Sequence, residues 1–335
     1  MRSKISFCWV MASIFQIVMI TSAIAQSQIA SVPFPTAPAQ WINSSPLSSE
    51  MLRGKSVVFW FYEELCPRCA AKWPEILKTA SEYEGKPVLF VAVNSGTSRA
   101  DVEGYVRRNH ITWPVIVDTD RSFEAFAKVG EISLNNIYQV AILDGTGQMH
   151  RGGIDLKSAA DSALATAKWK IEPSEIPASL KPAWQQIEFG QFAQAAPLIK
   201  KGLSAQSAET KSAAEKLNGV VAAEIKSTIE QAKQAQQGNN KWAAYKNLSS
   251  VSAKFKGFEI PSEVGDRLKE LSSDPAIKNE QAANKAMENI RKAVANATSP
   301  GQRKSVKGQL ERLVKQFEGT EAAVEAKQLL AKEGG

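Results

Sequence analysis

The chain has 335 residues, enough for two domains of ordinary size, and a formal net charge of +7. Residues 26–180 hold 15 basic and 17 acidic residues, whereas residues 181–335 hold 24 and 17, so the basic excess belongs to the second half. This excess could attract envelope polymers or lipid headgroups, but interspersed charges are more typical of a solvated helical surface, and no phosphate loop, paired-carboxylate site or nucleic-acid signature stands out.

The N-terminus is typical of a secretory signal. A basic start and an apolar stretch over residues 5–20 precede Ala23-Ile24-Ala25, a small-x-small cleavage sequence. We therefore predict a signal peptide over residues 1–25, with an uncleaved anchor as the alternative. Cleavage would remove Cys8 and leave a periplasmic or secreted protein with no membrane span after processing.

Residues 26–50 are rich in Ser, Pro and Ala and are predicted to be a linker, with Trp41 and Ile42 packing onto the next domain. Residues 51–170 alternate apolar runs with helix-like segments, which predicts a layered α/β domain. Residues 144–147 form a Gly-rich turn, which predicts a terminal hairpin. Strands are predicted over 57–62, 88–93, 115–117, 138–143 and 148–151, and helices over 70–83, 99–108, 122–128 and 156–168.

A CxxC motif, Cys66-Pro67-Arg68-Cys69, lies between the first apolar run and the first predicted helix. A cysteine at a helix N-terminus is stabilised as a thiolate by unpaired N–H groups and the helix dipole. The spacing therefore predicts a reversible dithiol/disulfide pair, with a structural short-loop disulfide as the alternative. Haem attachment needs His at the position of Ala70, and a zinc site has only the distant His110 and His150 to draw on, so we predict no cofactor or metal.

Charged residues flank the motif. Arg68 and Lys72 are expected to favour thiolates and to lower the pKa values of the cysteines, while Glu63 and Glu64 oppose them. For Arg68, a solvated loop position is an equally good interpretation.

Three prolines over residues 171–182 predict a linker, and residues 183–335 have helical periodicity. The pattern Leu-x-x-Val-x-x-x-Phe-x-Gly over 248–257 is echoed by Leu-x-x-Leu-x-x-x-Phe-x-Gly over 310–319, one apolar helix face ended by glycine. We predict degenerate tetratricopeptide-like hairpins that bind a partner protein. An irregular bundle or a long helical hairpin is the alternative.

Residues 54–153 resemble the thioredoxin fold, in particular the TlpA/ResA-like extracytoplasmic thioredoxins. The resemblance rests on the apolar strand before CxxC, Pro74 after it, Phe90-Val91-Ala92-Val93-Asn94, residues 110–118 around Trp113-Pro114, and Ala141-Ile142-Leu143-Asp144 before a glycine turn. It implies an α/β thioredoxin-like domain, followed here by an all-α helical domain.

The resemblance implies that Cys66 attacks a partner disulfide and that Cys69 resolves the mixed disulfide. The chain departs from the family pattern at four places. Leu65 replaces a Trp, Pro67 is shifted by one place, and Lys72 replaces an acidic residue. Tyr138 aligns with the cis-proline that positions the substrate backbone, and a trans peptide is expected there.

Together these features predict an extracytoplasmic thiol–disulfide oxidoreductase that acts on protein disulfides or dithiols, with a helical partner-binding domain. The alternative is a degenerate thioredoxin-fold scaffold or binding protein without efficient catalysis.

Overall fold

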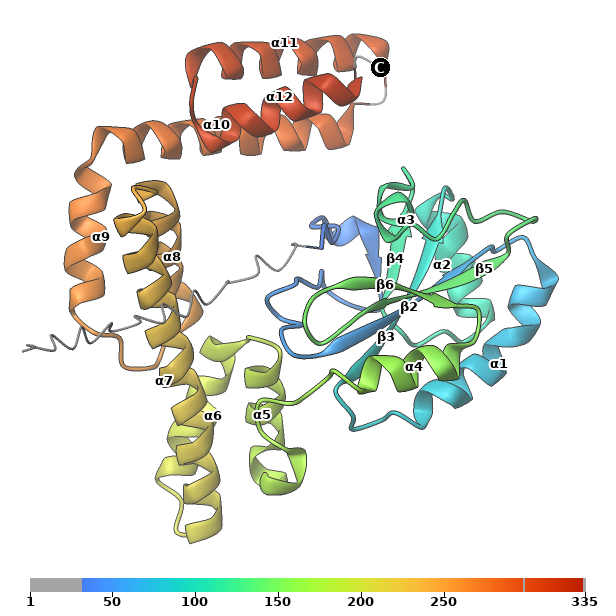
Figure 1. The fold of residues 1–335 in the computed structure, drawn as a ribbon, viewed down its shortest axis with the longest axis horizontal. Coiled ribbons are helices and arrows are strands. Elements are labelled where there is room, and N and C mark those ends of the chain that lie inside the picture. Colours follow the sequence, from blue (N-terminus) through green and yellow to red (C-terminus); the bar gives the residue numbers. More distant parts are fainter. Residues whose placement is uncertain (1–31, 298, 334–335) are drawn as a thin grey trace, which may run out of the picture.

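The computed structural model describes residues 32–297 and 299–333. A sheet covered by helices is followed by a series of helices along a curved path (Figure 1). Within the described residues, no helix is both long and apolar enough to cross a membrane. The predicted signal peptide and Cys8 lie outside the described residues.

Six strands form one mixed sheet in the order β1-β4-β3-β2-β5-β6. The parallel centre, β4-β3-β2, is extended on one side by antiparallel β5 and β6 and on the other by antiparallel β1. The strands are β1 (Trp41–Ile42), β2 (Ser56–Tyr62), β3 (Val88–Ser95), β4 (Val115–Asp118), β5 (Tyr138–Leu143) and β6 (Met149–Gly153). The predicted α/β thioredoxin-like fold is thereby confirmed.

Strand β2 is apolar throughout because both faces of the sheet are covered. Its residues 58, 60 and 62 enter one core, which includes Trp73 and Tyr105, and residues 57, 59 and 61 enter a second core, which includes Phe123. All seven of its residues are buried. The helices of this part are α1 (Pro67–Ser81), α2 (Arg99–Arg108), α3 (Ser122–Ala127) and α4 (Leu156–Leu164).

Four residues in the described part of the predicted linker are buried in the cores of the sheet domain: Val32, Phe34, Trp41 and Ile42. Trp41 and Ile42 form β1, which pairs with β4, so these two residues pack onto the sheet domain as predicted. Phe34 stacks on Phe123, and its ring also lies 6.1 Å from that of Phe59. The linker prediction is wrong for these four residues, because their side chains pack with Phe59 and Phe123 or pair with β4.

The second half is helical, as predicted. Its helices are α5 (Lys181–Glu188), α6 (Phe192–Leu203), α7 (Ala208–Gln237), α8 (Lys241–Lys254), α9 (Glu263–Ser273), α10 (Pro275–Asn296), α11 (Pro300–Gln316) and α12 (Glu321–Glu333). The echoed sequences end α8 and α11, where Gly257 and Gly319 have φ of 95° and 84°. Positive φ is the usual way to end a helix with glycine. The tetratricopeptide-like classification stays a prediction.

The predicted linker over residues 171–182 is packed rather than extended. It contains two 3₁₀ turns, Pro173–Glu175 and Ala178–Leu180, and Ile176 and Leu180 are buried in the helical core. The segment is therefore a packed connection, because the apolar side chains between its prolines, Ile176 and Leu180, pack into the helical core.

A seam joins the sheet part to the helical part. The Lys55 ammonium lies 2.7 Å from the Glu188 carboxylate, and both side chains are fully buried. The other carboxylate oxygen of Glu188 accepts from the backbone N–H groups of Lys170 and Ile171. The Trp169 indole donates to the carbonyl of Gly85 across the seam.

Candidate redox site

The two cysteines lie where β2 passes into α1. Cys66 is the N-cap of α1 with extended backbone (φ −89°, ψ 114°), and Pro67 is the first helical residue. Proline suits this position because its missing N–H would have no helical partner. The helix therefore begins three residues before its predicted start, and Cys69 lies in its first turn, with its N–H donating to the Cys66 carbonyl at 3.1 Å.

Both cysteines are free thiols and both are buried, Cys66 6% and Cys69 1% exposed. The Cys69 thiol donates a hydrogen bond to the carbonyl of Ile137, with 3.1 Å between Sγ and the oxygen. Ile137 immediately precedes β5, so the loop before this strand faces the resolving position of the motif.

Burial raises the pKa of Cys69 to about 12, and the hydrogen bond and charge of Cys66 and the charge of Glu63 add to the rise. The backbone N–H of Glu63 opposes it. The prediction that Arg68 and Lys72 lower the pKa of both cysteines is therefore wrong for Cys69. Desolvation of the buried Cys69 thiolate is the largest cause of this rise.

The two basic residues have other surroundings. Arg68 is exposed on the first turn of α1. The Lys72 ammonium lies 3.7 Å from the Glu75 carboxylate and 5.7 Å from the centre of the Tyr138 ring. Its positive charge is thus shared between a carboxylate and an aromatic face.

Tyr138 is the first residue of β5 and pairs with Tyr62. Its ring stacks on Trp60 at 4.9 Å between centroids and 20° between planes. The peptide bonds of the described residues are all trans, that before Tyr138 included. Tyr138 therefore occupies the end of the strand beside the motif, packed against the core rather than free.

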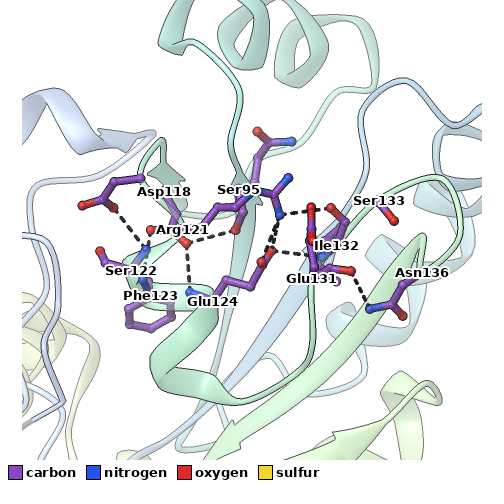
Figure 2. Close-up of polar contacts among 12 residues, drawn as sticks. Ser95, Asp118, Arg121, Ser122, Phe123, Glu124, Glu131, Ile132, Ser133 and Asn136 are labelled. Carbon is purple, nitrogen blue, oxygen red and sulfur yellow. Dashed lines mark hydrogen bonds and ion pairs between the residues drawn. The ribbon is translucent and has the colours of Figure 1, made fainter. Parts of the chain in front are cut away.

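The loop over residues 131–137 is held by a polar network on α3 that the sequence did not reveal (Figure 2). The Glu124 carboxylate accepts from the Arg121 guanidinium at 2.9 and 3.1 Å and from the Ile132 N–H at 3.2 Å. The Arg121 guanidinium also donates to the Ile132 carbonyl at 3.1 Å. Asp118 at the end of β4 accepts from the N–H groups of Phe123 and Glu124, which fixes the start of α3.

The loop that this network holds ends at Ile137, whose carbonyl accepts from the Glu63 N–H at 2.9 Å as well as from Cys69. In the sequence, this network is indicated only by polar residues directly after a predicted strand. That pattern is too common to single out Glu124 or Arg121. The neighbouring Glu64 carboxylate is tied to Asn94 and Thr97 at 2.6 and 2.5 Å.

Histidines lie apart from the motif. His110 is an exposed residue after α2, and His150 in β6 lies 2.6 Å from Asp144 of the hairpin. Among the described residues, no group of three or more His, Cys, Asp or Glu side chains could hold a metal ion.

Known proteins resemble the first half of the chain. Residues 33–146 match the family model Redoxin. The thiol-disulfide oxidoreductase ResA of Bacillus subtilis (strain 168) is 29% identical over 79 residues, which are 24% of this chain and 44% of that protein. ResA of Halalkalibacterium halodurans is 31% identical over 67 residues, 20% of this chain and 38% of that protein. The chain thus spans less than half the length of either relative.

Two solved structures resemble part of the chain. The structure of MTB dsbF in its mixed oxidized and reduced forms is 24% identical, with a TM-score of 0.32, and 39% of this chain and 100% of that chain are covered. A putative thioredoxin from Neisseria meningitidis is 22% identical, with a TM-score of 0.33, covering 41% and 91%. On its strand order, its CxxC position and its match to the Redoxin model, the first half of this chain is a thioredoxin-like domain that is similar in sequence to the ResA proteins.

Proposed function

We propose that this chain is a thiol–disulfide oxidoreductase that uses the pair Cys66 and Cys69. The Cys66 thiolate attacks one sulfur of a protein disulfide, forms a mixed disulfide and releases the other sulfur as a thiolate. Cys69 then attacks the Cys66 sulfur, releases the second substrate thiolate and closes the Cys66–Cys69 bond. Two electrons pass from the dithiol to the substrate, and the reverse direction oxidises a substrate dithiol.

The observation that carries this proposal is the position of Cys66 as the N-cap of α1 directly after β2, with Cys69 in the next turn. Helix N-termini favour anions, so the reactive sulfur is the one at the helix end. The similarity to ResA supports the same reaction class.

Reduction of insulin by dithiothreitol tests the activity. We expect the wild-type protein to accelerate insulin precipitation and Cys66→Ser to abolish the acceleration, with circular dichroism confirming that the variant folds. Equal rates with wild type and Cys66→Ser would contradict the proposal.

We further propose that the protein acts in the periplasm or after secretion, and that the helical half recruits or orients a protein partner. The signal-like sequence of residues 1–25 and the extracytoplasmic type of the domain support the first point. The buried seam at Lys55 and Glu188 supports the second, because it gives the helical half a defined orientation relative to the redox pair.

A binding or scaffold role without efficient exchange is the second candidate. Two observations favour it: Tyr138 stands where the family has its substrate-positioning proline, and Cys69 is a deeply buried thiol with a raised pKa. An insulin assay with no acceleration by the folded wild-type chain would select this candidate.

A further inference from the structure

Helix α11 carries a large share of the positive charge of this chain. Its 17 residues include one acidic residue, Glu311, and five basic residues: Arg303, Lys304, Lys307, Arg312 and Lys315. Five basic residues less one acidic residue give this helix a net charge of +4, against +7 for the whole chain. The basic excess of the second half is therefore concentrated on one helix rather than spread evenly along the helical half.

The charged side chains of α11 lie on its outer face. Its inner face is apolar, and Val306, Leu310 and Leu313 pack in a core with side chains of α10 and α12. The five basic residues and Glu311 are all exposed. Figure 1 shows α11 along an edge of the helical half, with α10 and α12 on one side of it. The basic face of α11 is therefore open to a partner.

The acidic residues of the neighbouring helices are engaged elsewhere. Glu321 of α12 pairs with Lys246 of α8 at 2.5 Å, and Glu325 of α12 pairs with Arg291 of α10. Glu280 of α10 accepts from the backbone N–H of Glu321 at 3.2 Å. Over residues 32–297 and 299–333, none of the five basic side chains of α11 forms an ion pair.

Like charges on one helix face repel one another. Arg303 and Lys307 are four residues apart, and Arg312 and Lys315 are three apart, which are the spacings that bring side chains together on a helix. Unpaired like charges at these spacings destabilise a helix slightly. An anionic surface that neutralises them removes this repulsion, so the charge pattern favours such a partner.

The composition of the basic face indicates which anionic partner it fits. The exposed residues of α11 include no aromatic side chain and no Leu, Ile, Val or Met. Protein interfaces are usually centred on large apolar or aromatic side chains and are depleted in lysine, and single-stranded nucleic acids stack their bases on aromatic rings. An anionic bilayer requires only positive charge spread over a surface. Residues 303–315 spread it along about 18 Å of helix.

We propose that α11 docks this protein on a membrane surface that contains anionic lipids. The five basic side chains contact the lipid phosphates, while the apolar face of the helix stays packed against α10 and α12. The attachment is therefore electrostatic and reversible. It determines where the protein is held and goes beyond the redox reaction proposed above.

Co-sedimentation of the full chain with lipid vesicles tests this docking. Vesicles of equal parts phosphatidylglycerol and phosphatidylcholine are compared with vesicles of phosphatidylcholine alone. The apolar stretch over residues 5–20 can bind both kinds, so the quantity measured is the ratio of the two partition coefficients. We expect a ratio of about 1,000 for wild type at about 0.1 M salt, and a fall towards 1 at about 1 M salt, because salt screens exposed charges.

A triple variant removes part of the basic face: Lys304→Gln, Lys307→Gln and Lys315→Gln. Glutamine is a good helix former, so the fold should be kept, which circular dichroism checks. Each basic side chain near an anionic bilayer contributes a factor of about five to partitioning, so we expect the ratio to fall about 100-fold.

The matched control removes the same net charge where α6 ends and α7 begins: Lys200→Gln, Lys201→Gln and Lys211→Gln. These lysines are exposed and form no ion pair within the described part of the chain. Figure 1 shows this turn at the opposite end of the helical half from α11. We expect the control to stay within about twofold of the wild-type ratio, because the charges of α11 are intact.

A wild-type ratio near 1 would overturn the assignment. Retention of the wild type, but not of the triple variant, on immobilised poly-glutamate would then assign this face to an acidic protein instead. Equal losses in the triple variant and the control would also overturn it, because net charge rather than α11 would be responsible. Cys66→Ser should bind vesicles like wild type, so failure of the proposed redox reaction is measured separately from failure of the docking.

Discussion

At the scale of single residues, burial decides the chemistry of the redox pair. Cys69 lies one turn inside α1 with its thiol against a carbonyl, and desolvation raises its pKa to about 12. The nearby basic residues do not offset this rise in pKa, because Arg68 is exposed and the Lys72 ammonium is paired with Glu75. Proximity along the chain is therefore a poor guide to which charge a thiol experiences.

This pKa predicts how stability changes at alkaline pH. Because the pKa of Cys69 is higher in the folded protein than its ordinary value of 9.0, its contribution is complete below pH 9 and is lost towards pH 12. We expect the free energy of unfolding of the reduced protein to fall by about 1–2 kcal/mol more than that of Cys69→Ser between pH 9 and 11. Urea titrations at each pH measure this, and parallel curves for the two proteins would contradict it.

At the scale of elements, the loop before β5 is positioned by α3. The Glu124 carboxylate is 6% exposed and binds both the Arg121 guanidinium and the Ile132 N–H. The same loop ends at the Ile137 carbonyl that faces Cys69. A short helix remote in sequence thus sets the surroundings of the redox pair.

Glu124→Gln tests this arrangement. The amide keeps one acceptor oxygen but loses the charge that pairs with Arg121, so we expect destabilisation of about 1–3 kcal/mol. Hydrogen exchange over residues 131–137 should become faster. Glu131→Gln is the matched control, because only the backbone carbonyl of exposed Glu131 takes part, and it should stay within about 0.5 kcal/mol of wild type. Unchanged exchange in Glu124→Gln would show that the loop is held by other contacts.

At the scale of the whole molecule, the two halves meet at a buried ion pair. Lys55 comes from the sheet part and Glu188 from α5. Burial lowers the pKa of Lys55 to about 8, with the charge of Lys170 acting in the same direction and Glu188 opposing. The free-energy cost of removing the Lys55 ammonium from water therefore exceeds the stabilisation that its attraction to Glu188 provides, as is common for buried ion pairs.

Substitutions at this pair should be strongly coupled. Glu188→Gln leaves the Lys55 ammonium buried without a counter-charge, and we expect it to cost about 3–5 kcal/mol. Adding Lys55→Met removes that charge and should recover most of the loss, while the amide oxygen still accepts from Lys170 and Ile171. Denaturant unfolding of both single variants and the double variant measures the coupling.

Additive changes in the free energy of unfolding would mean that the two side chains do not interact.

The ion pair also predicts a pH dependence of its own. Because the pKa of Lys55 is lowered from 10.5 to about 8, its unfavourable contribution is complete below pH 8 and is relieved as pH rises to 10.5. Lys55→Met should lack this rise in stability.

Much of this protein follows from sequence alone. The continuous apolar run of β2 requires a sheet covered on both faces, and CxxC after that run places a thiol pair at a helix start. The glycines after the two echoed helices mark their ends, because glycine tolerates positive φ without steric cost. These are local rules, so residues near one another in the chain are sufficient to state them.

Other features were decided by the tertiary structure alone. They depend on which residues, distant in the sequence, meet in the interior, where water is excluded. Phe34 is buried because its ring packs on Phe123, a residue 89 positions away in the numbering. The pKa of Cys69 rose because the Ile137 loop and the surrounding core exclude water from it. Lys55 and Glu188 are 133 positions apart in the numbering, and folding alone makes them a pair. Desolvation and long-range pairing are properties of the assembled chain, and no local pattern encodes them.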